Sequence, residues 1–192
     1  MHIDWAKKEI LFKIVYYGPG LSGKTTNLEF IHAHLDDKLK SDLISLKTRE
    51  DRTLFFDFMQ LDLDAIQGRK PRFFLYTTPG QVHYGFSRKL ILNGADAVVF
   101  VADSQRSRMD ANLDSLMDLE TKLINLGKTL ARFPWVLQYN KRDCSSAESI
   151  GFLQRKLNFL NVPYFEATAI TGDGVFETLK SVITLVFEKM KD

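Results

Sequence analysis

The chain has 192 residues, with 26 Lys and Arg against 24 Asp and Glu and a formal net charge of +2. This length favours a single domain spanning residues 1–192 with a substantial core. The small net charge excludes a strong electrostatic case for nucleic acid or an anionic membrane as partner. The single cysteine, Cys144, can form neither an internal disulfide nor a metal cluster.

The N-terminal segment predicts a short edge strand at Ile3–Trp5 and a buried strand from Ile10 to Tyr17. No apolar run approaches the length of a membrane span. Neither end shows a secretory leader, a myristoylation pattern or a prenylation cysteine. We therefore expect a cytoplasmic protein with no direct membrane anchor.

Directly after that strand stands Gly18-x-x-x-x-Gly23-Lys24-Thr25, the pattern of a phosphate-binding P-loop, and a helix to about His34 follows. An ordinary glycine-rich turn is the alternative, but the flanking strand and helix are the context that the P-loop requires. Glycines allow the backbone N–H groups to approach an anion, and the helix N-terminus and the lysine add positive potential. The Thr25 hydroxyl is a candidate Mg²⁺ ligand. The predicted phosphate-binding residues are Gly18, Gly20, Leu21, Ser22, Gly23, Lys24, Thr25 and Thr26.

The middle of the chain predicts a polar, irregular connection over Asp36–Lys47 and then a strongly charged segment over Thr48–Thr53. The strands Leu54–Met59 and Arg72–Thr77 follow, separated by a turn at Gly68, and form a hairpin. The loop Thr78–Gln81 leads into a helix that ends near Leu92.

The second half alternates strands with helices. An apolar run at Ala97–Ala102 is typical of a strand covered on both faces, and Ser145-x-x-Glu148 resembles a capping box at the start of a helix. The remaining predicted elements are a long helix over Met109–Leu126, strands at Trp135–Tyr139 and Val162–Glu166, and a final helix from Val175. This order predicts an α/β fold with a mixed, mostly parallel six-stranded sheet and helices on both faces, with or without the N-terminal edge strand. Loops at the carboxyl ends of such strands converge, so the ligand site is expected there.

The loop after Trp135–Tyr139 carries Asn140-Lys141-Arg142-Asp143. A carboxylate at Asp143 matches the two parallel donors on the guanine edge, which adenine lacks, and a buried carboxylate left unpaired against adenine would cost several kcal/mol. The stem of Lys141 can lie along the base, and Asn140 can tie this loop to the P-loop. The Ala169 N–H, at the end of the next strand, is a candidate donor to guanine O6. Without the P-loop, the tetrapeptide would predict only a polar turn.

Taken together, these motifs resemble a Ras-like small GTPase, a P-loop NTPase fold, and more closely the MglA type of bacteria, which controls gliding motility and cell polarity. The resemblance covers nearly the whole chain. The matching stretches are Lys13–Asn27, Ser45-Leu46, Asp51–Phe58, Leu75–Thr77, Pro79–Val82, Ser87–Leu92, Val98–Gln105, Gln138–Asp143, Gly172–Phe176 and Thr178–Lys180.

The resemblance implies roles for four residues around the switches. Thr53 corresponds to the threonine that ligates Mg²⁺ when GTP is bound, and Arg52 to an arginine finger supplied within the same chain. Gly80 presents its N–H to the γ-phosphate, and Gln81 orients the attacking water. Without the resemblance, Arg52 and Gln81 would be ordinary solvated residues.

Two positions depart from the Ras-like pattern. Ras-like proteins carry an aspartate that holds Mg²⁺ through water, and Thr77 stands at that position here. The same replacement of aspartate by threonine resembles the MglA type. Asp57 on the neighbouring strand is a candidate replacement for the missing carboxylate, with a structural role as the alternative. Ile170 stands where a lysine flanks the base.

The sequence thus predicts a GTPase that binds GTP/GDP with Mg²⁺ and acts as a switch. A guanine-nucleotide-binding scaffold with negligible hydrolysis is the alternative, and a P-loop ATPase or nucleotide kinase is disfavoured by Asn140–Asp143. The resemblance implies a Roadblock/LC7-type (MglB-like) regulatory dimer as partner, downstream polarity or motility effectors, and recruitment to the cell poles through partners.

Overall fold

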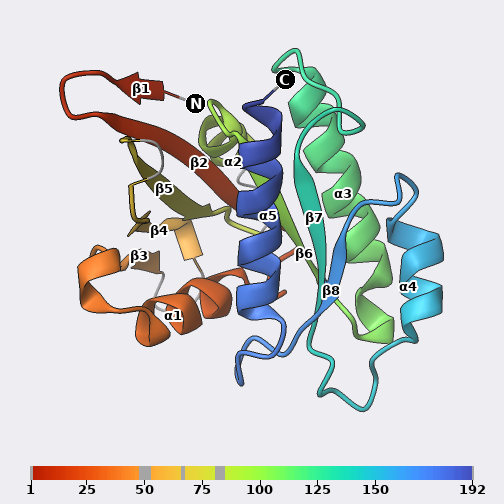
Figure 1. The fold of residues 1–192 in the computed structure, drawn as a ribbon. Helices are drawn as coiled ribbons and strands as arrows, with labels where there is room; N and C mark the ends of the chain where they lie inside the picture. The colour runs from red at the N-terminus through yellow and green to blue at the C-terminus, as the bar shows by residue number, and fades with distance from the viewer. Residues whose placement is uncertain (1, 48–52, 66–67, 81–84, 192) are drawn as a thin grey trace.

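The computed structural model describes residues 2–47, 53–65, 68–80 and 85–191, and its core is an eight-stranded sheet (Figure 1). The strand order is β3-β4-β5-β2-β6-β7-β8, and β1 pairs with β2 beside that path. The strands are β1 His2–Asp4, β2 Glu9–Tyr17, β3 Ile44–Lys47, β4 Thr53–Asp62, β5 Lys70–Thr77, β6 Ala97–Asp103, β7 Trp135–Asn140 and β8 Tyr164–Glu166. The helices are α1 Lys24–His34, α2 Gly85–Leu92, α3 Met109–Ile124, α4 Ile150–Leu157 and α5 Val175–Lys189, with 3₁₀ turns η1 Asp37–Leu39 and η3 Arg106–Arg108.

The pairing confirms the predicted mixed, mostly parallel sheet. Strand β2 runs parallel to both β5 and β6, and β6, β7 and β8 continue in parallel. The β4–β5 pair is antiparallel, as the predicted hairpin requires, and β1 adds the N-terminal strand antiparallel to β2. The carboxyl ends of the parallel strands therefore share one rim of the sheet.

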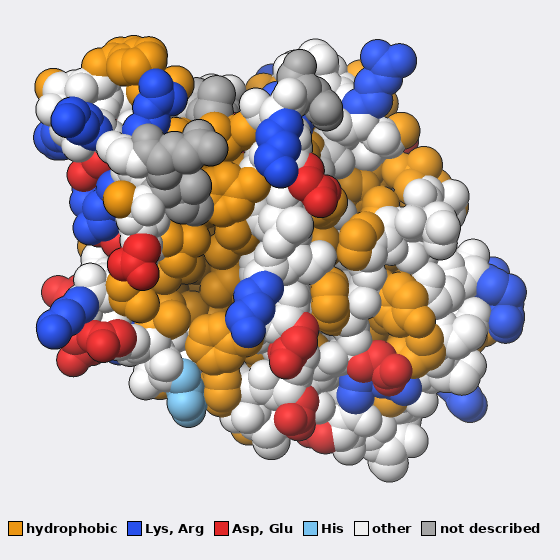
Figure 2. Space-filling view, in the orientation of Figure 1, with side chains coloured by type: hydrophobic (Ala, Val, Ile, Leu, Met, Phe, Trp, Pro, Cys, Tyr) orange, Lys and Arg blue, Asp and Glu red, His pale blue; other side chains and the backbone are white. Residues whose placement is uncertain are grey.

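Side-chain alternation along β2 divides the core into two layers. Phe12, Ile14 and Tyr16 pack beneath α1 and α5 on one face, whereas Val15 and Tyr17 pack against the layer formed by α2, α3 and α4. Figure 1 shows α1 and α5 in front of the sheet. Figure 2 shows hydrophobic side chains gathered in a hollow beside α5 on that face. Because the two layers cover the central strands on both sides, β2 and β6 hold their end loops rigidly.

Two local predictions are wrong. The segment Asp36–Lys47 is not wholly irregular, because β3 pairs antiparallel with β4, with a register shift between Ser45 and Lys47. The predicted capping box is also displaced. Helix α4 begins at Ile150, and the Ser149 side chain accepts the capping hydrogen bond from Phe152 N at 3.3 Å.

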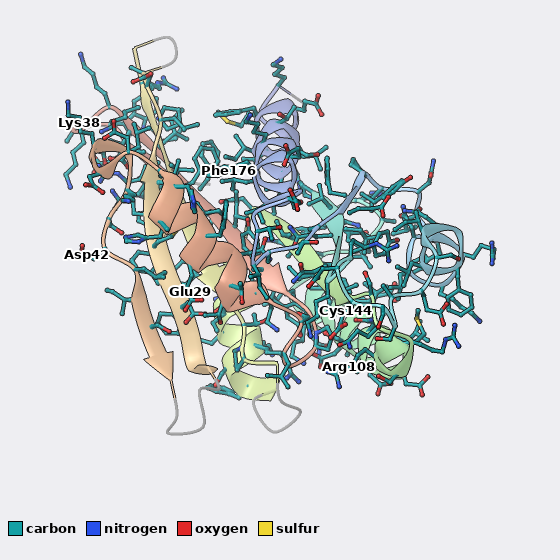
Figure 3. The ribbon with its side chains drawn as sticks, turned by 90° about the horizontal axis from the view of Figure 1, so that it is seen from below. Glu29, Lys38, Asp42, Arg108, Cys144 and Phe176 are labelled. Atoms are coloured by element: carbon teal, nitrogen blue, oxygen red, sulfur yellow. The ribbon has the colours of Figure 1, made fainter. Side chains whose placement is uncertain are left out.

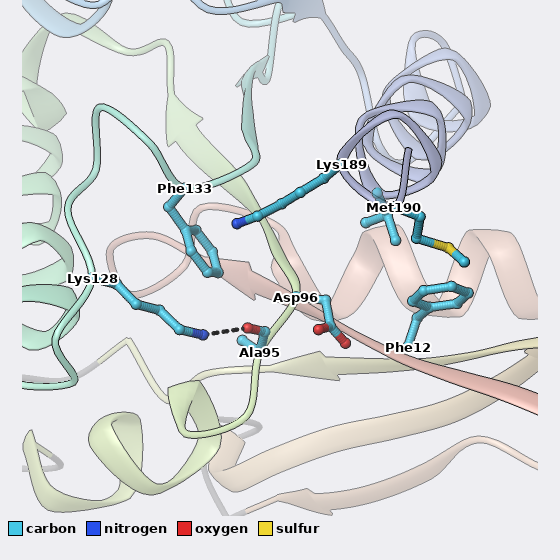
Figure 4. Close-up of a pocket in the computed structure, with 8 residues that line it drawn as sticks. Phe12, Ala95, Asp96, Lys128, Phe133, Lys189 and Met190 are labelled. Carbon is cyan, nitrogen blue, oxygen red and sulfur yellow. Dashed lines mark hydrogen bonds between the residues drawn. The ribbon is translucent and has the colours of Figure 1, made fainter. Parts of the chain in front are cut away.

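A cavity of about 190 Å³ lies at the opposite rim, near the amino ends of β6 and β7 (Figure 4). Its lining combines Phe133 with Asp96, Lys128 and Lys189. It is not formed by the predicted phosphate-binding residues. Among the described residues, no helix has both the length and the apolar character needed to cross a membrane.

Candidate functional site

The phosphate loop connects β2 to α1, and its glycines are required by its shape. Gly18 and Gly23 have φ angles of +142° and +97°, which disfavour residues with a Cβ. A Cβ on Gly18 would lie 2.2 Å from Val101 O, and one on Gly23 would lie 2.1 Å from Asn140 Nδ2. The loop therefore lies tightly against β6 and the Asn140 loop, as a backbone cradle for an anion requires.

Lys24 lies across this loop. Its Nζ donates hydrogen bonds to Gly18 O at 2.9 Å and Pro19 O at 2.6 Å, and the side chain is buried. Burial lowers the pKa of the Lys24 ammonium to about 7; the Asp57 carboxylate opposes this shift, and Arg88 and Arg108 add to it. A polyphosphate bound here would supply negative charge that stabilises the Lys24 ammonium. The residues of this loop therefore fit a bound polyphosphate.

Asp57 on β4 is the centre of a cluster of hydroxyl groups. Its fully buried carboxylate accepts hydrogen bonds from Thr25 Oγ1 at 2.5 Å, from Thr77 Oγ1 at 2.7 Å and from Ser45 Oγ. Its backbone N–H donates to Thr77 Oγ1 at 2.7 Å. The structure thus brings the candidate replacement carboxylate beside Thr25, the predicted metal ligand. This set of oxygen atoms has the chemistry that Mg²⁺ prefers.

The loop after β5 packs against the phosphate loop at Gly20. A Cβ on Gly80 would lie 2.3 Å from Gly20 Cα and 2.4 Å from Gly20 N, so only glycine fits at this approach. The two predicted catalytic residues, Arg52 and Gln81, lie outside the described residues. Thr53 begins β4, and its side chain is also outside the described part of the chain.

Asn140 joins three loops. Its Nδ2 donates to Ser22 O in the phosphate loop at 2.8 Å, and its Oδ1 accepts from Ala169 N at 2.9 Å. The predicted tie to the P-loop is therefore present. The Ala169 N–H, expected to face guanine O6, instead donates to Asn140 in this structure.

Lys141 and Asp143 flank the expected base position in different ways. Lys141 adopts a positive φ of 66° and donates from Nζ to Asp103 Oδ2 at 2.7 Å. Asp143 is exposed, and its carboxylate has no hydrogen bond or ion pair within the described ranges. A polar side chain that the fold leaves unpaired at this rim is available to a ligand.

Sequence reasoning missed two groups of residues at this site. Asp103 and Arg108, at the carboxyl end of β6 and the end of η3, contact Lys141 and the phosphate loop. Behind that loop, Gln138 is hydrogen-bonded to Asn27 and Thr178, and all three are buried. The position of Asp103 directly after the apolar run at Ala97–Ala102 was the one available indication, because strand ends carry the site residues.

Comparison with known proteins gives relatives of one kind, although no protein-family model matches. The chain is 53% identical over 189 residues to the mutual gliding-motility protein MglA of Myxococcus xanthus, covering 98% of this chain and 97% of that protein. It is 26% identical to the Ypt/Rab-type GTPase ypt7 of Schizosaccharomyces pombe, covering 96% of this chain and 86% of that one. It is also 26% identical to the Ypt/Rab-type GTPase Rab7 of Neurospora crassa, covering 91% and 82%.

Proposed function

The chain belongs to the MglA-type Ras-like small GTPases, and we propose that residues 1–192 form a single G domain that switches partners controlling cell polarity or gliding motility. As a member of this family it binds guanine nucleotides and hydrolyses GTP to GDP. In the proposed cycle, GTP orders the two switch segments and hydrolysis releases them, so that partners distinguish the two states.

Guanine recognition is assigned to Asn140, Lys141 and Asp143, and to the Ala169 amide, which would exchange its hydrogen bond to Asn140 Oδ1 for one to guanine O6. The observation that supports this assignment is that the side chains of this loop differ in whether the protein itself gives them hydrogen-bond partners. Asn140 and Lys141 are fixed by hydrogen bonds, whereas the Asp143 carboxylate is exposed and unpaired in the described structure. A carboxylate held free at this position accepts the two parallel donors of guanine.

The metal site is assigned to Thr25 and Thr53, with Asp57 in place of the carboxylate that Thr77 lacks. Support comes from the hydroxyl cluster around Asp57, which includes Thr25 Oγ1 at 2.5 Å. When bound, Mg²⁺ neutralises the charge of the phosphates. Asp57 would hold the hydroxyls of Thr25 and Thr77 beside the metal through the hydrogen bonds that they donate to its carboxylate.

Catalysis is assigned to Gln81, which orients the attacking water, and to Arg52, which stabilises negative charge that develops on the phosphates. The phosphate-facing residues of the proposal are Gly18, Gly20, Leu21, Ser22, Gly23, Lys24, Thr25, Thr26 and Gly80. The test is phosphate release from GTP by the wild type, Gln81→Leu and Arg52→Ala. Arg52→Ala is expected to lose roughly 10³-fold or more in rate. Equal rates in all three would overturn the catalytic assignment.

The regulatory partner is proposed to be a Roadblock/LC7-type dimer. Two large apolar side chains on α2, Phe86 and Leu90, are 81% and 63% exposed. Helix α2 follows the loop that carries Gly80 and Gln81 in the sequence, so a partner bound to these side chains would respond to the nucleotide state of that loop. Downstream polarity or motility effectors would bind the GTP state, and recruitment of the cytoplasmic protein to the poles would run through such partners. Adding the dimer to the phosphate-release assay should accelerate turnover.

The replacement of a metal-site carboxylate by Thr77 favours a second candidate, a guanine-nucleotide scaffold with negligible hydrolysis. The same assay separates the two functions. GTP that persists with and without the dimer would support the scaffold and contradict the switch.

A further inference from the structure

Three consecutive carbonyls of the phosphate loop accept hydrogen bonds from two basic side chains. Lys24 Nζ binds Gly18 O and Pro19 O, and Arg108 Nη2 donates to Gly20 O at 2.7 Å. In a trans peptide the N–H points opposite to the carbonyl. Holding these carbonyls therefore fixes the orientation of the amides that follow them, and successive fixed N–H groups are the feature from which anion-binding concavities are built.

Arg108 reaches the loop from outside it. The residue ends η3, just before α3, and Figure 3 shows it on the rim seen from below. Its Nη2 contacts Gly20 O, while its Nε lies 3.6 Å from Asp103 Oδ2. Because a guanidinium is planar and rigid, the position of one contact sets the position of the other.

Asp103 is fully buried at the end of β6 and is itself tightly held. Its backbone N–H donates to Asn112 Oδ1 at 3.0 Å and its carbonyl accepts from Asn112 Nδ2 at 2.8 Å. Its Oδ1 accepts from Gln105 N at 3.1 Å. Its Oδ2 faces two cations, Arg108 and Lys141, and the distance to Lys141 Nζ is 2.7 Å. A buried carboxylate needs such partners, so this position is strongly specified.

We propose that Asp103 and Arg108 are positioning residues that couple the phosphate loop to the guanine loop. The Asp103 carboxylate orients the Lys141 side chain in the guanine loop and the Arg108 side chain next to the phosphate loop. Arg108 in turn holds the Gly20 carbonyl. Both loops are thereby held in register for one ligand. This inference rests on the proposed function, since it assigns the nucleotide as that ligand.

The test is the release rate of a fluorescent GDP analogue from the full chain with Mg²⁺. Arg108→Ala and Asp103→Asn should each accelerate release on the order of tenfold or more, because each removes a charge-assisted contact. The double variant should release no faster than the faster single variant, because the two residues act as one unit. Arg108→Lys should fall between the wild type and Arg108→Ala, since an ammonium keeps the charge but cannot span both contacts.

Arg106 provides a matched control. It lies on the same turn, but its side chain is 82% exposed and its Nε binds Glu148 Oε1 at 2.7 Å. Arg106→Ala should leave release within about twofold of the wild type, as expected for an exposed ion pair. In the nucleotide-free protein, amide exchange of residues 20–22 should rise in Arg108→Ala and stay unchanged in Arg106→Ala.

Release from Arg108→Ala at the wild-type rate would overturn the inference, as would effects of the single variants that multiply in the double variant. Either result leaves the proposed function intact if the wild type still holds the GDP analogue tightly. Failure of the wild type to bind the analogue would overturn both. Should Asp103→Asn not fold, the comparison of Arg108→Ala, Arg108→Lys and Arg106→Ala still decides the result.

Discussion

Replacing Lys24 by methionine is expected to remove a specific pH dependence from the nucleotide-free protein. Burial lowers the pKa of the Lys24 ammonium to about 7, far below the 10.5 of an ordinary lysine. Between these two values the unfolded chain keeps a proton that the folded protein has released. The free energy of unfolding therefore rises with pH in this window, by up to about 1.4 kcal/mol per pH unit.

From about pH 7.5 to 9.5 the wild type should therefore gain about 2.5 kcal/mol relative to Lys24→Met. Denaturant titrations of both nucleotide-free proteins across this range measure the difference directly. Other titrating groups are common to both proteins, so they cancel. Lys128→Met is the matched control, because burial also lowers the pKa of that lysine but at the opposite rim.

Bound nucleotide should reverse the effect. A polyphosphate stabilises the ammonium and raises the pKa of Lys24, so binding above pH 7 takes up a proton and affinity falls by up to about tenfold per pH unit. If the stability difference between wild type and Lys24→Met is flat from pH 7.5 to 9.5, Lys24 does not have the lowered pKa that its burial implies.

Three further substitutions test neighbouring parts of the structure. Gly23→Ala combines a strained φ of +97° with a Cβ 2.1 Å from Asn140 Nδ2, and it should weaken GDP binding at least about tenfold by calorimetry; unchanged affinity would contradict the tight cradle. Asp57→Asn should raise the Mg²⁺ concentration needed for half-maximal nucleotide retention by about tenfold or more, whereas an unchanged requirement would leave Asp57 a purely structural residue. Leu28→Ala, at a fully buried position of α1, should lower the free energy of unfolding by about 2–5 kcal/mol, and a loss below 1 kcal/mol would show that α1 is not packed as described.

The parts of the site that could be predicted are those with fixed local spacing. The phosphate loop and Asn140 follow from short motifs at strand ends, and the expected tie between them is present as the hydrogen bond from Asn140 Nδ2 to Ser22 O. Asp103 and Arg108 belong to no such motif, and their contacts cross between segments distant in sequence. The Asp57 cluster depends on the register of β4 against β3 and β5, which sequence periodicity does not specify.

The local errors have similar causes. β3 has few residues and forms only by pairing with β4, so intrinsic propensity gives little indication of it. The capping-box prediction is wrong because Glu148 forms an ion pair with Arg106, and the Ser149 side chain caps α4 instead. The mostly parallel arrangement of the sheet followed from the alternation of strands and helices, which does not depend on such long-range contacts.

The proposed site for a guanine nucleotide is formed by four loops at one rim of the sheet. Displacement of a fluorescent GDP analogue from the wild-type protein by unlabelled GDP and ADP, with Mg²⁺ present, tests it most directly. We expect ADP to require a concentration at least roughly 100-fold higher than GDP, because guanine offers the Asp143 carboxylate two hydrogen-bond donors that adenine lacks. Equal displacement by the two nucleotides would contradict it.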